Sequence, residues 1–209
     1  MFPPPANVIR ELFRDPDMFD STSSWQQAGF AVEGEGEKSN IMVASHPSAP
    51  GVLFKKYSKK ISLKKQRRNY QRRVAGAEKL RKFVKAQRLT KIVVPRKHLH
   101  ELPPEFSRKG KSSYVLVVER LSLLESTASK RLYHEIDRET LRQLCAVLRE
   151  FRGLDSGVRN VPFTSGGQIA FIDTERWDEH RESKIWLRRI REYLSSDRRA
   201  LADTLGPKG

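Results

Sequence analysis

The chain has 209 residues, of which 37% are hydrophobic and 32% charged, enough for one domain or two small lobes with a buried core. Lys and Arg number 41 against 25 Asp and Glu, and the resulting net charge of +16 predicts affinity for an acidic partner. No apolar run is long enough to cross a bilayer, and the first residues lack the pattern of a secretory signal. The single cysteine, Cys145, excludes an internal disulfide and favours a reducing, intracellular environment.

The first part of the sequence predicts one short helix and three strands. Asn7 is expected to cap a helix that continues to Phe13, and residues 19–29 are polar and loop-like. Residues 30–43 predict two strands joined by a glycine turn. Residues 52–57 predict a third strand after a second turn.

The middle of the sequence predicts a long basic helix and then two strands. Residues 63–88 carry apolar side chains at helical spacing. Residues 92–95 predict a short strand, and residues 114–118 predict a stronger one. Between these strands we expect a polar loop that contains His98 and His100.

The last part of the sequence is mainly helical. Asp137 is expected to cap a helix whose apolar face consists of Leu141, Leu144, Cys145, Leu148 and Phe151. A late strand is predicted at 168–172, followed by one or two helices over about 177–205. The expected fold is therefore α+β, with a small β-rich half and then a small helical half.

A glycine turn and a following strand lysine are the first candidates for phosphate binding. Gly34, Gly36 and Ser39 lie between two predicted strands, where backbone N–H groups can approach a phosphate closely. Lys55 lies on the next strand and would supply a cation to the phosphates. Lys56 is the rival, because neighbouring strand residues face opposite sides of a sheet.

A single carboxylate in the basic helix is the candidate partner of this lysine. Glu78 is the only acidic residue between Lys55 and Lys91. We expect it on the apolar side of the helix, beside Ala77 and Leu80. An isolated acid in such a basic stretch indicates a specific ionic partner.

The most demanding pattern joins a polar loop to the end of a late strand. Asp155 is followed five residues later by Asn160, and Asp173 closes the apolar strand that comes next. Phosphoryl transfer needs a group that orients the acceptor hydroxyl and oxygen ligands for Mg²⁺. Asp155 fits the first role, and Asn160 and Asp173 fit the second. Mg²⁺ and ATP are therefore the expected cofactors.

Taken together, these residues resemble the protein-kinase-like superfamily, and in size the minimal kinases that some bacteria deliver into host cells. The resemblance covers roughly residues 28–176. It implies a minimal bilobal fold, with a small antiparallel-sheet N-lobe and a reduced helical C-lobe. It also implies that Val118 lies near the gatekeeper position and that the backbone of Glu119, Arg120 and Leu121 meets adenine.

The sequence departs from the family pattern at four positions around the predicted catalytic loop. Gly153 stands where the family has a histidine, and Thr174 stands where it has a phenylalanine. Gly157 replaces a lysine, whose charge Arg159 could supply as in tyrosine-kinase-like loops. Glu175 replaces a glycine, and this ending is similar to that of aminoglycoside and choline kinases.

These departures leave the acceptor open. The first expectation is an ATP-dependent protein kinase, a bacterial effector that phosphorylates a protein hydroxyl in the host cytosol. The first alternative is a small-molecule or lipid-sugar kinase, and the second is a non-catalytic pseudokinase or basic binding module. The expected organisation is an N-terminal helical extension over 1–20, an N-lobe over 21–121 and a truncated C-lobe over 122–209. A short C-terminal part argues against control by phosphorylation at Thr174.

The basic stretch over 59–73 is a second candidate surface. Like charges one helical turn apart destabilise an isolated helix, and an acidic partner or activator would relieve that cost. The stretch lacks the interleaved aromatic residues that stack on bases, which argues against nucleic acid. We expect a monomer, either cytoplasmic or secreted by a bacterium into the host cytosol.

Overall fold

A computed structural model describes residues 2–19, 21–35, 41–57, 62–108, 113–179 and 187–205 of the chain. The chain forms an α+β structure with two compact units. Unit 1 consists of Met1–Val74 and Arg96–Arg120, and unit 2 consists of Ala75–Pro95 and Leu121–Gly209.

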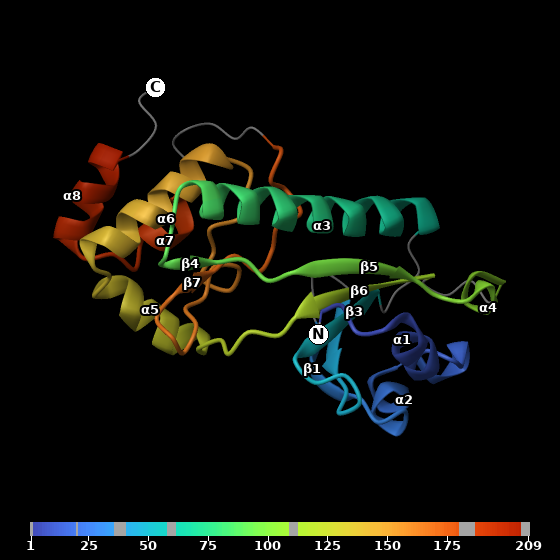
Figure 1. Cartoon of the computed structure of the whole chain (residues 1–209). Coiled ribbons are helices and arrows are strands. Elements are labelled where there is room, and N and C mark those ends of the chain that lie inside the picture. Colours follow the sequence, from blue (N-terminus) through green and yellow to red (C-terminus); the bar gives the residue numbers. More distant parts are fainter. Residues whose placement is uncertain are drawn as a thin grey trace. The chain divides into compact units, whose positions relative to one another are not determined.

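Unit 1 is built on a five-stranded antiparallel sheet with the strand order β1-β2-β3-β6-β5 (Figure 1). Its strands are β1 (Ala31–Glu35), β2 (Ile41–Ser45), β3 (Val52–Tyr57), β5 (Lys97–Glu101) and β6 (Tyr114–Glu119). The predicted third strand has the observed bounds, and the predicted strand over 114–118 is confirmed. The polar loop expected around His98 is wrong, because these residues form the edge strand β5.

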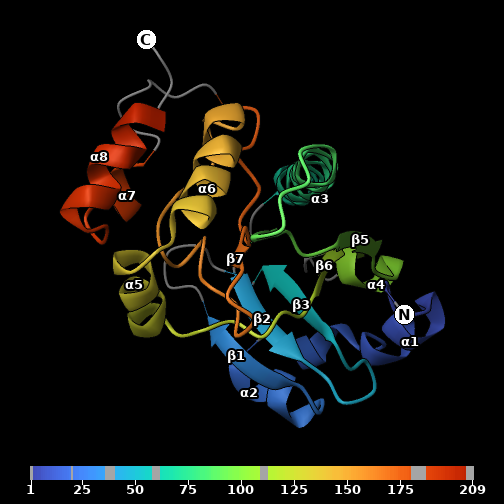
Figure 2. The same ribbon diagram turned by 60° about the vertical axis from the view of Figure 1, so that its left-hand side comes forward.

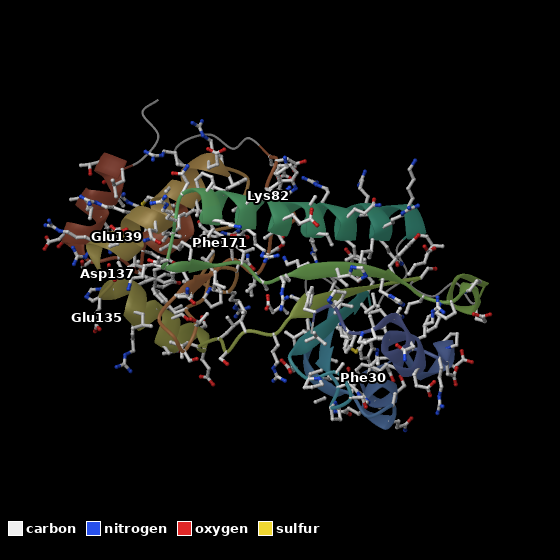
Figure 3. The ribbon with its side chains drawn as sticks, in the orientation of Figure 1. Phe30, Lys82, Glu135, Asp137, Glu139 and Phe171 are labelled. Carbon is white, nitrogen blue, oxygen red and sulfur yellow. The ribbon has the colours of Figure 1, made fainter. Side chains whose placement is uncertain are left out.

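Unit 1 also contains the short helices α1 (Ala6–Leu12), α2 (Thr22–Gln27) and α4 (Pro104–Arg108) and the 3₁₀ helix η1 (Pro16–Phe19). Residues of α1, α2 and α4 pack against one face of the sheet. The shared core is rich in aromatic rings, including Phe13, Trp25, Phe30, Phe54 and Phe106. Phe30, labelled in Figure 3, contacts the rings of Phe13 and Trp25 edge-on or tilted at centroid distances of 5.4 and 4.8 Å. Aromatic rings favour such arrangements.

Two expectations for the N-terminal region are wrong in detail. Residues 19–29 are not all loop, because Ser21 and Ser24 form a reciprocal capping box that starts α2. Asn7 does not cap α1, since the N-cap residue is Pro5. Within the region predicted as an N-terminal helical extension over 1–20, Ile9 and Phe13 are buried in the core of unit 1.

Helix α3 (Leu63–Ala86) confirms the predicted long basic helix. Its first half belongs to unit 1, where Tyr70 is buried with Tyr57 and Val118 on the second face of the sheet. Its second half belongs to unit 2, although the predicted N-lobe included it. The predicted boundary at residue 121 lies beside the observed one.

Unit 2 is mainly helical (Figure 2), and its two short strands form a parallel sheet. Its elements besides the end of α3 are β4 (Ile92–Val93), α5 (Ser126–His134), α6 (Arg138–Glu150), β7 (Ile169–Ala170), α7 (Arg188–Arg191) and α8 (Ser196–Leu205). Phe171, labelled in Figure 3, is fully buried in the core. A single hydrophobic cluster links α6, β4, β7 and the C-terminal helices.

Helix α6 begins and packs as the sequence predicts. The Oδ1 atom of Asp137 accepts a hydrogen bond from the Thr140 N–H at 2.8 Å, and its Oδ2 atom accepts one from the Thr140 hydroxyl at 2.6 Å. These hydrogen bonds lower the pKa of Asp137 below its ordinary value. The apolar face of the helix, which includes Cys145, is buried in the core. Burial raises the pKa of Cys145 to about 12.

Within the described ranges, we find no helix that combines the length and the apolar character needed to span a bilayer.

Candidate active site

Strand β3 places Lys55 and Lys56 on opposite faces of the sheet. The Lys56 side chain is buried, and its Nζ atom lies 5.6 Å from the centre of the Phe106 ring in the aromatic core. Lys55 is half-buried on the other face and is paired in register with Val43 and Leu116. Its carbonyl oxygen accepts a hydrogen bond from the Tyr70 hydroxyl at 3.1 Å, which ties β3 to the start of α3. Of the two lysines, Lys55 is therefore the one on the face shared with α3.

The predicted glycine turn is described only at its first residue. Gly34 lies in β1, where the pairing with β2 shifts register between Val32 and Gly34. Among the described residues, no atom would lie within 4 Å of a Cβ atom at Gly34. Gly36 and Ser39 lie outside the described residues.

The segment after β6 is held by backbone and ionic contacts. The Glu119 N–H donates to the Arg96 carbonyl at 2.9 Å, and the Glu119 carboxylate contacts the Arg96 guanidinium at 2.8 Å. The Arg120 N–H donates to the Gly51 carbonyl at 2.9 Å. Within the described part of the chain, the Leu121 N–H makes no hydrogen bond.

In unit 2 an irregular hairpin brings the backbone of Asn160 beside the segment that follows β7 and leads to Asp173. The Ile172 N–H donates to the Asn160 carbonyl at 3.0 Å, and the Ala170 N–H donates to the Pro162 carbonyl at 2.8 Å. Asn160 and Asp173 are both half-buried. The backbone of Asn160 is thus hydrogen-bonded to the residue that precedes Asp173.

Side chains of helix α5 hold this hairpin through hydrogen bonds to its backbone. The Tyr133 hydroxyl donates to the Val161 carbonyl at 2.5 Å, and the Ser129 hydroxyl oxygen accepts from the Phe163 N–H at 3.2 Å. Burial raises the pKa of Tyr133, so its phenol stays protonated and can donate. The ring of Tyr133 also contacts Phe163 at 4.9 Å between centroids. The residues that follow Asn160 are therefore fixed on a rigid element.

The Asp155 carboxylate is held from two directions. Its Oδ1 atom accepts a hydrogen bond from the Gly157 N–H at 2.9 Å. The Nη1 atom of Arg189 on α7 lies 3.0 Å from Oδ1 and 2.7 Å from Oδ2. The Asp155 side chain is 26% exposed, so the carboxylate still reaches solvent. Arg159, which the sequence suggested as the cation here, has an exposed side chain, and the guanidinium at Asp155 is that of Arg189.

Gly153 allows the chain after Asp173 to cross directly over the candidate loop. A Cβ atom at Gly153 would lie 1.9 Å from the Arg176 carbonyl oxygen and 2.6 Å from that of Glu179. Real Cβ atoms do not approach backbone oxygens so closely, and the position therefore requires glycine. The backbone over 176–179 occupies the space that a histidine side chain would need, which gives the first departure from the kinase pattern a physical reason.

A second glycine allows α3 to approach the residue after Asp173. A Cβ atom at Gly76 would lie 2.1 Å from the Thr174 carbonyl oxygen and 2.6 Å from the Trp177 ring. The Thr174 side chain is completely buried. The Asp173 Oδ1 atom accepts the Glu175 N–H at 3.2 Å, which tightens the turn further. The segment that carries Asp173 is thus closely packed against α3.

The structure corrects the position expected for Glu78. Its side chain is exposed, whereas Ala77 and Leu80 beside it are buried. Glu78 therefore does not lie on the apolar side of α3, and its role as the partner of Lys55 stays a prediction. Among the described residues, no group of three or more His, Cys, Asp and Glu side chains is arranged to hold a metal ion. A metal at Asn160 and Asp173 would take its remaining ligands from phosphate and water.

The roles of three residues of this site were missed by the sequence analysis. Arg189 lies far from Asp155 in sequence, in a tail with many arginines, so no spacing singles it out. Gly76 and Gly153 were visible, but their packing role depends on a chain crossing that only the structure reveals. A glycine inside a strongly helical stretch is the one signal that could have drawn attention to Gly76.

Comparison with known proteins finds no protein-family model that matches the chain, and no curated protein sequence that matches it either.

Proposed function

We propose that the protein is an ATP-dependent phosphotransferase of the protein-kinase-like type. The observation that carries the proposal is the hairpin of unit 2, where the Ile172 N–H bonds to the Asn160 carbonyl immediately before Asp173. The same unit presents Asp155 as a restrained but accessible carboxylate. An acceptor-orienting carboxylate and two oxygen ligands in one unit are what phosphoryl transfer needs.

The division into two units supports a minimal bilobal arrangement. Unit 1 has a five-stranded antiparallel sheet with Lys55 on a central strand, as a small N-lobe would. Unit 2 is mainly helical and carries the loop residues, as a reduced C-lobe would. The sheet also supports Lys55 over Lys56 as the phosphate lysine, because Lys56 is buried against Phe106.

The roles of the residues follow from their chemistry. Asn160 and Asp173 would hold Mg²⁺, which neutralises charge on the phosphates when bound. Lys55 and the glycine turn at Gly34, Gly36 and Ser39 would hold the phosphates, with Glu78 as the proposed partner of Lys55. An Asp155 carboxylate oxygen would accept a hydrogen bond from the acceptor hydroxyl and then its proton.

The adenine contact would come from the segment after β6. The Glu119 and Arg120 N–H groups are used inside the protein, whereas the Leu121 N–H makes no hydrogen bond within the described part of the chain. A single available donor on a segment fixed at Glu119 and Arg120 fits the edge of a purine. Replacing Leu121 by proline would remove that donor.

We propose a protein hydroxyl as the acceptor, in a host cell into which a bacterium delivers this protein. The alternative acceptor is a small molecule, because the ending with Glu175 is similar to that of aminoglycoside and choline kinases. The Glu175 N–H bonds to the Asp173 carboxylate, so Glu175 lies beside the proposed metal ligand. A non-catalytic binding module is the remaining alternative.

The start of α3 supports a further role in binding an acidic partner. Lys64, Lys65, Arg67 and Arg68 are exposed, and the first turn of the helix contains no acidic residue. Positive charge at a helix N-terminus is unfavourable, so an acidic protein surface would stabilise this end. Changing these four residues to glutamate should abolish capture of a host partner, whereas changing the exposed Lys82 and Lys85 at the other end of α3 should not. Lys82 is labelled in Figure 3. Equal loss in both variants would contradict a local docking surface.

Phosphate transfer from labelled ATP in the presence of Mg²⁺ tests the proposed activity. The wild type would be compared with Asp155→Ala and Asp173→Ala, with and without a eukaryotic cell lysate. A matched control is Asp178→Ala, which removes an exposed aspartate from the same segment.

Transfer to a lysate protein that is lost in the first two variants, but kept in the control, would support a protein kinase. Mg²⁺-dependent ATP binding without protein transfer would favour a small-molecule acceptor. If the wild type neither transfers phosphate nor binds ATP, the enzyme proposal is wrong.

A further inference from the structure

One arginine from the C-terminal region is bound to the proposed catalytic carboxylate. Arg189 contacts both Asp155 oxygens through its Nη1 atom, at 3.0 and 2.7 Å. Among the described residues, its Nη2 and Nε atoms make no hydrogen bond. The Arg189 side chain is 66% exposed, so these two nitrogens remain open to an anion. A guanidinium has five N–H donors and can hold a carboxylate and a phosphate oxygen together.

The side chain of Arg189 also passes beside Gly157. A Cβ atom at Gly157 would lie 3.3 Å from the Asp155 Oδ1 atom, 3.6 Å from the Arg189 Cδ atom and 3.7 Å from its Nη1 atom. A larger side chain at residue 157 would therefore enter the space that the arginine uses. The absence of a side chain at Gly157 and the position of Arg189 are complementary.

We propose that Arg189 is the cation of the transfer site and takes the place that a lysine at residue 157 would occupy. This inference rests on the proposed phosphotransferase function. The guanidinium would orient the Asp155 carboxylate through Nη1 and bind an oxygen of the transferred phosphoryl group through Nη2 or Nε. An arginine 34 residues away in sequence thereby completes the loop.

In the proposed step, the γ-phosphoryl group passes from ATP to the acceptor hydroxyl. The acceptor oxygen bonds to the γ-phosphorus, and the bond from that phosphorus to the ADP oxygen breaks, leaving its electron pair on ADP. The hydroxyl proton passes to an Asp155 carboxylate oxygen. The Arg189 guanidinium supplies positive charge and N–H donors while negative charge shifts toward ADP.

A purely stabilising role explains the contact less well. Exposed ion pairs contribute little to stability, because water and salt screen them and the side chains lose freedom. Arg191, on the same short helix, forms such a pair with Asp203, and the side chains of both residues are substantially exposed. The Asp155–Arg189 pair differs because its carboxylate is the less exposed partner and lies in the proposed transfer loop.

The test uses the full chain with three substitutions at this site and one control. Arg189→Ala should lower kcat about 100-fold or more with a smaller change in the KM for ATP, the size of effect seen when one preorganised donor is removed. Arg189→Lys should retain more activity than Arg189→Ala, because it keeps the charge. Arg191→Ala is the matched control on α7 and should change kcat less than about threefold, while thermal unfolding confirms that each variant is folded.

A rescue variant tests whether Arg189 takes the place of a lysine at residue 157 or only contributes positive charge to the site. Gly157 does not have a positive φ, so a side chain there is compatible with the backbone. In the Arg189→Ala background, Gly157→Lys should restore about tenfold or more of the lost kcat. In the wild-type background, the same change should lower activity, because both side chains then compete for one space.

Each outcome separates this inference from the function on which it rests. A wild type without phosphate transfer would overturn both. An active wild type with unchanged activity in Arg189→Ala would overturn only the role of Arg189. Higher activity in Arg189→Ala would also overturn it and would identify the pair as an inhibitory contact. A folded double variant without any recovery would overturn the proposed replacement of the lysine.

Discussion

The two units position their candidate residues by different physical means. In unit 1, Lys55 lies on a strand with hydrogen-bonded neighbours on both sides, so the alternation of β3 determines the face of its side chain. In unit 2, Asp155 and Asp173 lie outside regular strands and helices. Their loops are held by turns, by an arginine and by two close approaches at glycines.

The difference predicts how each unit tolerates substitution. A strand residue such as Lys55 can be replaced without moving the backbone, because the ladder of hydrogen bonds holds the strand. A loop whose path requires glycine at Gly76 and Gly153 is not held in this way. In unit 2, small substitutions far from the reacting groups should therefore displace the candidate residues. In unit 1, a substitution should remove only the side chain that is replaced.

The largest effect is expected at Gly153. Gly153→Ala places a Cβ atom 1.9 Å from the Arg176 carbonyl oxygen, so backbone must move, at a cost of about 3 kcal/mol. Denaturant unfolding would measure this loss. Gly166→Ala is the control, because its Cβ atom would lie 3.7 Å from the nearest atom, the Thr164 hydroxyl. Equal stability of the two variants would show that the crossing over Gly153 is absent in solution.

A change of unusual sign is expected at Gly76. Glycine to alanine within a helix normally stabilises by about 1 kcal/mol. Here the new Cβ atom would lie 2.1 Å from the Thr174 carbonyl oxygen, so we expect a net loss of about 2 kcal/mol. The same denaturation experiment, combined with measurement of phosphate transfer, should reveal loss of both stability and activity. A more stable Gly76→Ala variant would contradict the close packing of α3 on the Asp173 segment.

The two neighbouring lysines of unit 1 should separate stability from activity. Lys56→Ala removes a buried stem from the core beside Phe106 and should cost about 1–2 kcal/mol. Lys55→Met keeps a similar stem on the other face and should change stability by less than about 0.5 kcal/mol. Under the proposed function it should nevertheless abolish phosphate transfer. If Lys56→Met also abolished transfer in a stable protein, the assignment of the phosphate lysine would be wrong.

The smallest effect is expected at the cap of α6. Asp137→Ala removes the acceptor of the Thr140 N–H and should cost about 1 kcal/mol at neutral pH. The folded protein lowers the pKa of this carboxyl, so its ionic contribution is complete above the ordinary value of 3.8 and is lost as the pH falls through the folded value. The stability gap between wild type and variant should therefore narrow in acid. Asp137→Asn, which still caps, should show no such pH dependence.

Regular elements were the part of the fold that local sequence could predict. The bounds of β3, the presence of the long helix α3 and the cap of α6 were predicted. Each has a sequence signal carried by residues close together in the chain. The strand β5 was missed, since its polar residues gain strand structure only by pairing with β6. The helix α2 was missed because its serine capping box was not recognised in a polar segment.

The candidate site was predictable in its residue types but not in its contacts. The pattern of Asp155, Asn160 and Asp173 was visible, and the hydrogen bond between the Ile172 N–H and the Asn160 carbonyl brings two of these segments together. The exposed position of Glu78 was not visible, because helical spacing alone does not say where an apolar face ends. The arrival of Arg189 at Asp155 depends on the path of the chain through unit 2, which no local pattern encodes.

The single cysteine has a practical consequence for studying unit 2. Cys145 is buried on α6, and its raised pKa leaves almost no reactive thiolate at neutral pH. A thiol reagent can therefore label the native chain only during the moments when this unit opens. The labelling rate would count those openings in the unmodified sequence, without any introduced probe. Unit 1 contains no cysteine, so thiol labelling reports the opening of unit 2 alone.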